Sequence, residues 1–224
     1  MNIFVTGAGR GIGLALTKAF LKEGHSVLAV SRNVETLKKI NSSNLTFFSF
    51  DLANHSFAPL LQKVQNTFNS LDVLINNAGV LISRPLLEFS ESDFDLLFNV
   101  NVKAAYKMVQ GCVPFMGEGS HIINITSMGG FQGSVKFPGL ALYSAAKGAL
   151  AVLTESMALE LTGKKISVNA LALGAVQTEM LSAAFPEYKA PLQPFEMADF
   201  IKDFALTGHK VYNGKILPVS LSTP

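Results

Sequence analysis

The chain has 224 residues, of which 49% are hydrophobic and only 15% are charged, and its formal net charge is +2. This composition supports one sizeable folded core and excludes a chain that is disordered as a whole. The small net charge and the lack of a basic run argue against binding to nucleic acid or to an anionic membrane surface.

Apolar runs alternate with amphipathic helical patterns along the whole chain. The runs predict strands at residues 3–6, 26–30, 45–50, 73–75, 121–125, 166–171 and 215–219. The helical patterns cover residues 12–23, 34–40, 57–68, 92–109, 141–161 and 197–206. Strands that alternate with helices of this length indicate right-handed βαβ units. We therefore predict a doubly wound α/β Rossmann fold, with a parallel seven-stranded sheet and helices on both faces, as a single domain over residues 1–224.

The stretch TGAGRGIG, residues 6–13, follows the first predicted strand and opens the first predicted helix. Glycine permits positive φ and lets a backbone approach a phosphate closely, and a helix N-terminus supplies free N–H groups. An ordinary strand-to-helix turn with incidental glycines is the alternative. The candidate phosphate-binding residues are Gly7, Gly9, Arg10, Gly11, Ile12 and Gly13.

Tyr143 and Lys147 lie four residues apart in the predicted helix 141–161, so they share one helix face. A free tyrosine has a pKa near ~10, and a nearby ammonium favours the ionised form. We therefore expect Lys147 to lower the pKa of Tyr143 enough for acid–base chemistry. A surface Tyr and Lys on an ordinary helix would give the same pattern.

Five short motifs occur in an order that resembles the short-chain dehydrogenase/reductase family. They are the TGxxxGxG loop, Asn76-Asn77-Ala78-Gly79 after the fourth strand, Asn101, Ser127 after the fifth strand, and Tyr143-Ser144-Ala145-Ala146-Lys147. The resemblance covers nearly the whole chain. It implies a hydride transfer between a nicotinamide cofactor and a carbonyl or alcohol.

The resemblance also implies a role for each residue of this tetrad. Tyr143 would exchange a proton with the substrate oxygen, and Ser127 would hydrogen-bond the same oxygen. Lys147 would hold the nicotinamide ribose, and Asn101 would position a water behind Lys147 as a proton relay.

Residues after the second strand indicate the cofactor. An acidic residue commonly follows this strand in NAD-binding folds, whereas Ser31-Arg32 stands here. Arg32 and Arg10 suit a 2′-phosphate, so we expect NADP(H) rather than NAD(H). Asp51 is expected either to bind the adenine or to cap the following turn. The other residues that the resemblance places on the cofactor are Leu52, Asn77, Ala78, Gly79, Val176 and Thr178.

The chain departs from the family pattern after the sixth strand. Leu173-Gly174 replaces the usual Pro-Gly, which is expected to loosen the turn beside the nicotinamide. Residues 179–196 are the predicted substrate lid, with Met180, Leu181, Phe185 and Phe195 as apolar members. Because this lid is brief, we expect an open site that favours an apolar or aromatic carbonyl compound. A homodimer or homotetramer is expected, with the helices 92–109 and 141–161 at the dimer surface.

The remaining sequence features point to a soluble cytoplasmic protein without a metal. The single cysteine, Cys112, cannot form an intrachain disulfide, and the N-terminus lacks the pattern of a signal peptide. The four histidines lack metal-ligand spacing. One functional alternative is a non-catalytic NADP(H)-binding regulator on the same fold. A sugar epimerase or dehydratase is disfavoured, because the chain has no room for a second substrate domain.

Overall fold

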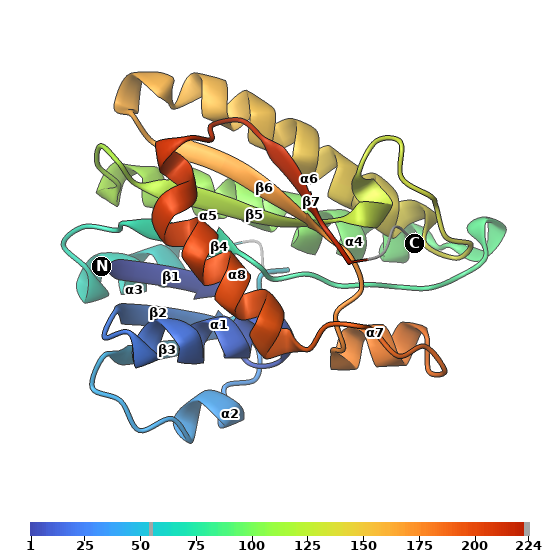
Figure 1. Cartoon of the computed structure of the whole chain (residues 1–224), viewed down its shortest axis with the longest axis horizontal. Helices are drawn as coiled ribbons and strands as arrows, with labels where there is room; N and C mark the ends of the chain where they lie inside the picture. The colour runs from blue at the N-terminus through green and yellow to red at the C-terminus, as the bar shows by residue number, and fades with distance from the viewer. Residues whose placement is uncertain (54–55, 222–224) are drawn as a thin grey trace.

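A computed structural model of the chain describes residues 1–53 and 56–221. Its strands form one sheet in the order β3-β2-β1-β4-β5-β6-β7, and every neighbouring pair is parallel (Figure 1). The strands are β1 Asn2–Thr6, β2 Ser26–Ser31, β3 Leu45–Ser49, β4 Val73–Asn76, β5 His121–Ser127, β6 Ser167–Leu173 and β7 Ile216–Val219. Strand order reverses between β1 and β4, where a doubly wound sheet leaves a crevice at its carboxyl ends.

Helices cover both faces of this sheet. They are α1 Gly11–Lys22, α2 Glu35–Lys38, α3 Ala58–Thr67, α4 Glu91–Phe98, α5 Ala104–Cys112, α6 Ala141–Glu160, α7 Glu179–Ala184 and α8 Pro194–Thr207. One hydrophobic cluster joins α1, α2 and α8 to the sheet, and Figure 1 shows α1 and α8 crossing in front of the strands. A second cluster joins α3, α5 and α6 to the opposite face. The predicted doubly wound Rossmann fold is confirmed.

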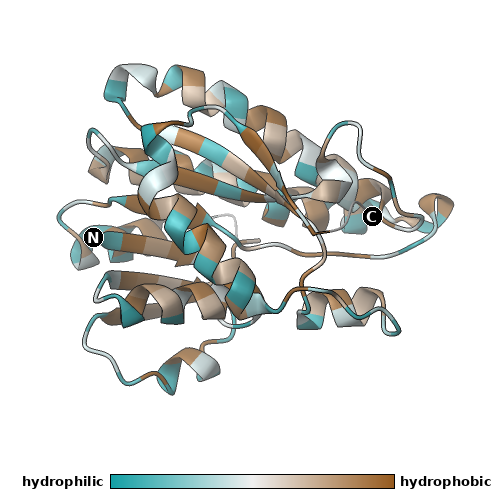
Figure 2. Cartoon of the chain, viewed as in Figure 1, coloured by the Kyte–Doolittle hydropathy of each residue, from teal (hydrophilic) through white to brown (hydrophobic). Residues whose placement is uncertain are grey.

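The strands are apolar on both faces because helices pack on both sides. In β1, Ile3 and Val5 enter the cluster with α1 and α8, while Phe4 between them enters the cluster with α3 and α5. All three side chains are fully buried. Figure 2 shows the resulting run of hydrophobic colour through the central strands. Such near-continuous apolar runs are typical of a parallel sheet covered on both faces.

Two predicted elements have different limits in the structure. The helix predicted at 92–109 is divided by a π-helical turn at Asn99–Lys103, and α5 then continues to Cys112. The predicted lid at 179–196 contains a helix, α7, that the sequence analysis missed. Pro194 starts α8, so only residues 179–193 of the predicted lid lie before this helix, and Phe195 lies on α8 with 63% of its surface exposed.

Within the described residues, the structure contains no helix with the length and apolar character that crossing a membrane requires. Cys112 is fully buried, and burial raises the pKa of its thiol to about 12. The thiolate, which is the reactive form, is therefore scarce at neutral pH.

Candidate active site

A cavity of about 600 Å³ opens at the carboxyl ends of β1, β4, β5 and β6. This volume is in the range of cofactor and small-molecule sites. Every residue that the sequence analysis selected for cofactor or catalysis lines this cavity, except Gly9 and Asn101. Segments distant in the sequence therefore meet at the crevice that the strand order predicts.

The glycine loop between β1 and α1 lies at one wall of the cavity. Gly7 has a φ of 69°, and a Cβ there would come within 2.7 Å of the Cα of Ala78. A Cβ at Gly13 would lie 2.2 Å from the carbonyl oxygen of Gly7. Arg10 at the N-cap of α1 makes no side-chain cap hydrogen bond. The loop is thus packed too tightly for side chains, and its helix N-terminus is open to an anion.

Asn77 holds this loop against the end of β4. Its side-chain amide donates to the carbonyl oxygens of Thr6 and Gly7, at 2.9 and 3.3 Å. The hydroxyl of Thr6 accepts the backbone N–H groups of Asn77 and Ala78, both at 3.1 Å. The resemblance assigned Asn77 to the cofactor, and the structure adds a second task that the sequence analysis missed. The side chain fixes the shape of the phosphate loop.

The end of β2 is basic where it meets the cavity. Arg10, Ser31 and Arg32 line the cavity there, and Gly9 packs behind them, with its Cβ position 2.5 Å from the hydroxyl oxygen of Ser31. Glu35, the first acidic residue after β2, pairs with Lys38 at 2.6 Å and is not part of the lining.

Asp51 and Leu52 line the cavity after β3. The carboxylate of Asp51 accepts the N–H of Ala53 at 3.0 Å, which is the turn-capping contact that the sequence analysis left as one alternative. Because Asp51 also faces the cavity, the adenine contact stays a prediction beside it.

Tyr143, Ser127 and Lys147 meet at the centre of the cavity. Ser127 ends β5 and accepts the N–H of Gly129 at 3.2 Å. The hydroxyl groups of Tyr143 and Ser127 are hydrogen-bonded to each other. Lys147 is buried, lies one turn after Tyr143 on α6, and donates from Nζ to the carbonyl oxygen of Ile125 at 2.9 Å. A hydroxyl pair and a buried ammonium thus share one wall.

The pKa values of Tyr143 and Lys147 differ from the sequence-based prediction. Burial raises the pKa of Tyr143 to about 12, and its hydrogen bond to Ser127 opposes the rise only in part. Burial lowers the pKa of Lys147 to about 8. The expected lowering of the Tyr143 pKa by Lys147 is therefore wrong for the protein alone. The physical reason is desolvation, which disfavours both the phenolate and the ammonium.

Asn101 sits in the π-helical turn and is buried. Its side-chain amide donates to the carbonyl oxygens of Val80 and Leu97, both at 2.9 Å, and its Oδ1 accepts the N–H of Val80 at 3.2 Å. A Cβ at Gly79 would lie 3.0 Å from this Oδ1 and 3.3 Å from Nζ of Lys147. The side chain thus holds the turn after β4 close to Lys147. The water relay assigned to Asn101 stays a prediction.

The segment after β6 is held by a backbone hydrogen bond and by close packing. The N–H of Gly174 donates to the carbonyl oxygen of Val219 at 2.9 Å, and a Cβ at Gly174 would lie 2.2 Å from the hydroxyl oxygen of Ser220. The expectation that the missing proline loosens this turn is therefore wrong. Val176 and Thr178 line the cavity, and the hydroxyl of Thr178 caps α7.

Apolar side chains complete the wall opposite the glycine loop. The sequence analysis had selected Met180, Leu181 and Phe185 from the lid, and these do line the cavity. Other residues that line the cavity on this side are Leu81, Leu96, Val100, Met128, Phe137, Leu140 and Tyr188. Leu96 and Val100 are four residues apart, just before Asn101, so helical spacing alone would have placed them together.

Comparisons with known proteins agree with this geometry. Residues 1–189 match the family model of short chain dehydrogenases. An uncharacterised oxidoreductase of Staphylococcus aureus is 32% identical over 216 residues, which is 93% of this chain and 92% of that protein. A 3-oxoacyl-[acyl-carrier-protein] reductase of Thermotoga maritima is 32% identical over 185 residues, which is 79% of this chain and 74% of that protein.

Solved structures share the whole fold. A short chain dehydrogenase from Burkholderia cenocepacia, in complex with NADP, superposes with a TM-score of 0.88 at 25% identity. The match covers 97% of this chain and 95% of that one. A 4-hydroxyisoleucine dehydrogenase complexed with NADH superposes with a TM-score of 0.86 at 26% identity, over 98% of this chain and 96% of that one.

Proposed function

The chain belongs to the short-chain dehydrogenase family of oxidoreductases, and from this premise we propose that it transfers a hydride between NADP(H) and a carbonyl or secondary alcohol. Tyr143 is the general acid and base of this proposal. One observation carries it: the hydroxyl of Tyr143 is paired with that of Ser127 in the cavity that the open glycine loop also lines. The substrate carbonyl, which would accept the hydride, and the cofactor, which would carry it, can therefore bind in the same cavity.

The residues present fit a dinucleotide. The N-terminus of α1 and the closely packed glycines of the loop before it suit a pyrophosphate, and the turn after β4 also lines the cavity. Lys147 and Val176 lie further along the same cavity, where the nicotinamide end would be held. Bound NADPH would supply the hydride.

Tyr143 then supplies the proton for reduction. Its pKa of about 12 keeps the hydroxyl protonated at neutral pH, which is the form that donates to a carbonyl oxygen. The hydroxyl of Ser127 can give that oxygen a second hydrogen bond as negative charge develops on it. The Lys147 ammonium, held on Ile125, lies 5.9 Å from the Tyr143 ring centre, where its charge opposes but does not outweigh the desolvation of the phenolate left behind.

The discriminating experiment is NADPH oxidation across a panel of ketones and aldehydes, with Tyr143→Phe as the variant. We expect Tyr143→Phe to lower kcat by roughly 10²- to 10⁴-fold, because a positioned general acid contributes about that much. NADPH affinity should change little. Tight NADPH binding by the wild type without turnover on any carbonyl would contradict the proposal and favour a non-catalytic NADP(H)-binding regulator.

The preference for NADP(H) is proposed on the arginines at the end of β2. Arg10 and Arg32 line the cavity there, and Glu35 is paired away from it. Solved relatives bind either NADP or NADH, so the choice depends on this chain's own residues. We expect Arg32→Ala to lower kcat/KM for NADPH about tenfold or more, since hydrogen bonds to charged groups contribute about 1.5–3 kcal/mol. The value for NADH should change little.

Lys38→Ala is the matched control for this test. Lys38 is an exposed cation on α2 that pairs with Glu35, and it does not line the cavity. We expect it to leave both cofactors unaffected. A wild-type kcat/KM for NADH equal to that for NADPH would contradict the assigned preference.

We also propose a homodimer through the α4, α5 and α6 surface. Exposed apolar side chains lie there, with Tyr106 on α5 exposed by 41% and Val152 and Leu159 on α6 by 64% and 79%. Large apolar patches on soluble proteins mark interaction sites. Light scattering should show a dimer or a tetramer, and Val152→Glu should shift it toward the monomer.

A further inference from the structure

Among the residues that the structure describes, the substrate side of the cavity has no free charged side chain. Among the lining residues, Arg10, Arg32 and Asp51 lie at the ends of β2 and β3 and at the glycine loop. Lys147 is bound to a backbone carbonyl, and the carboxylate of Glu179 lies beside the glycine loop, 3.6 Å from a Cβ position at Gly11. The opposite wall is built from apolar side chains of α4, the lid and the loop after β5. A carboxylate or phosphate on the substrate would find no free cation to pair with among these lining residues.

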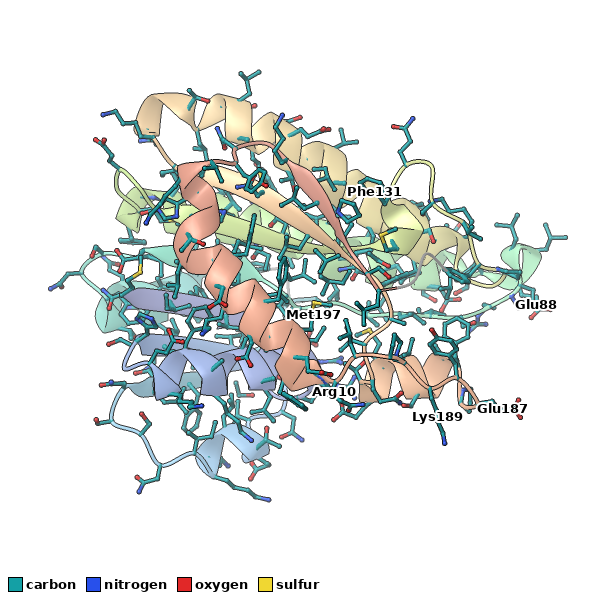
Figure 3. All side chains as sticks on the ribbon, viewed as in Figure 1. Arg10, Glu88, Phe131, Glu187, Lys189 and Met197 are labelled. Atoms are coloured by element: carbon teal, nitrogen blue, oxygen red, sulfur yellow. The ribbon has the colours of Figure 1, made fainter. Side chains whose placement is uncertain are left out.

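The charged residues of the lid do not change this picture. Glu187 and Lys189 are exposed, and neither lines the cavity. Figure 3 shows both at the outer tip of the lid, with their side chains pointing away from the body of the protein. The lid therefore presents its apolar side to the cavity.

Two aromatic rings from different segments meet over the cavity. Phe137 comes from the loop between β5 and α6, and Phe185 comes from the lid, directly after α7. Their ring centres are 6.5 Å apart and their planes cross at 61°, an edge-to-face pair. Both rings are only partly buried. Aromatic side chains favour flat partners at such distances, in edge-to-face or offset-stacked arrangements.

The lid is fastened at its base, so it presents Phe185 in a defined place. The side-chain oxygen of Gln177 accepts the N–H of Ala190 at 2.8 Å, and its amide donates to Ser182 at 3.0 Å. The backbone N–H of Gln177 donates to the carbonyl oxygen of Leu192, also at 2.8 Å. These bonds join the two ends of the lid to each other.

The loop that carries Phe137 is fastened as well. Gly139, with a φ of 82°, accepts the N–H of Arg84 at 2.9 Å, and a Cβ there would lie 2.9 Å from the hydroxyl oxygen of Ser83. The N–H of Leu140 donates to the carbonyl oxygen of Phe137 at 3.2 Å. Phe137, which lines the cavity, is therefore held in place by the contacts of the residues that follow it.

We propose that Phe137 and Phe185 form an aromatic clamp that selects uncharged carbonyl compounds with an aromatic ring next to the reacting carbonyl. The substrate ring packs against the partly exposed faces of this edge-to-face pair, and the pair directs the carbonyl toward Tyr143. It excludes acids because their charge would be desolvated without a partner. This assignment rests on the proposed carbonyl reduction and adds its substrate class and two specificity-determining residues.

The test uses methyl 4-formylbenzoate, 4-formylbenzoate and hexanal as aldehydes with NADPH. The first two share the ring and the aldehyde and differ in charge, and the third lacks the ring. We expect kcat/KM of the wild type to be at least tenfold higher for the ester than for the acid. Phe137→Leu and Phe185→Leu should each lower kcat/KM for the ester about three- to tenfold, the range that aromatic contacts contribute. The value for hexanal should stay within about twofold.

Phe131→Leu is the matched control. Phe131, labelled in Figure 3, lies between β5 and α6 like Phe137 but does not line the cavity, so this variant should leave all three values unchanged. Equal use of the acid and the ester would overturn the clamp. A parallel loss for ester and hexanal in the two clamp variants would also overturn it.

Ligand-observed NMR of the same three compounds measures binding, so it tests the clamp even when no compound is reduced. Binding of the ester that weakens in Phe137→Leu and Phe185→Leu, with no NADPH oxidation, supports the clamp and refutes the proposed reduction. Turnover without any preference for the ester refutes the clamp and leaves the reduction standing.

Discussion

Replacing Lys147 by methionine removes a buried ammonium group and keeps most of the side chain's volume. The ammonium is needed beside Tyr143 for the proposed chemistry, yet its burial is unfavourable for folding. Folding lowers the pKa of Lys147 from 10.5 to about 8. At about 1.4 kcal/mol for each pKa unit, the charged lysine destabilises the cofactor-free protein by about 3 kcal/mol at neutral pH. The variant also loses the hydrogen bond to Ile125, which reduces its expected gain in stability by about 1 kcal/mol.

The sign of the pH dependence follows from the same values. The folded protein binds this proton less tightly than the unfolded chain does, so the wild type gains stability as the pH rises from 8 toward 10.5. Below pH 8 that gain is absent. Lys147→Met does not titrate there, so we expect it to be more stable than the wild type by about 2 kcal/mol at pH 7.5 and about equal at pH 9.5.

Urea unfolding of the cofactor-free proteins at the two pH values measures this difference, and NADPH oxidation measures the loss of activity. We expect the variant to lose turnover while it gains stability at pH 7.5. A variant that is less stable than the wild type at pH 7.5, or a stability difference that does not change with pH, would refute the reasoning. Either result would mean that the ammonium is better solvated than its burial indicates.

Two further predictions concern residues elsewhere in the fold. His121 is buried, and this burial lowers the pKa of its imidazole to about 4, against the opposing hydrogen bond to the carbonyl oxygen of Ala205 at 3.1 Å. Between pH 6.5 and 4 the wild type should therefore lose about 3 kcal/mol of unfolding free energy that His121→Phe does not lose, and parallel urea titrations would contradict this. Gly13→Ala places a methyl group 2.2 Å from the carbonyl oxygen of Gly7, which should displace the phosphate loop and weaken NADPH binding about tenfold or more. Gly163→Ala, which has open space around it, is the control in the same fluorescence titration, and equal affinity in both variants would count against a tight loop.

Much of the fold could be predicted because its signals are local and repeated. Each strand is an apolar run and each helix has a periodic face, so their alternation alone indicates a parallel sheet. The π-helical turn around Asn101 leaves no comparable signal, since one extra residue in a turn hardly alters the periodicity. The helix α7 was missed because its six residues are too few to establish a period.

Some features of the candidate site could likewise be predicted from the sequence, and others could not. The four-residue spacing of Tyr143 and Lys147 places them on one face of any helix, and the structure brings both to the cavity. Their pKa values could not be predicted, because desolvation depends on what packs around them in three dimensions. The pair Phe137 and Phe185 was equally out of reach, since its two rings come from segments that meet only through the tertiary fold.

The fastening of the lid by Gln177 has a consequence for how this site could acquire new specificities. The two ends of this segment are hydrogen-bonded to each other. The residues between them can therefore change while the ends keep their positions on the protein. Residues 179–189 could be exchanged for those of another oxidoreductase without disturbing the sheet or the phosphate loop. Gln177 itself would have to be retained, because its hydrogen bonds to Ala190 and Leu192 hold the end of the segment in place.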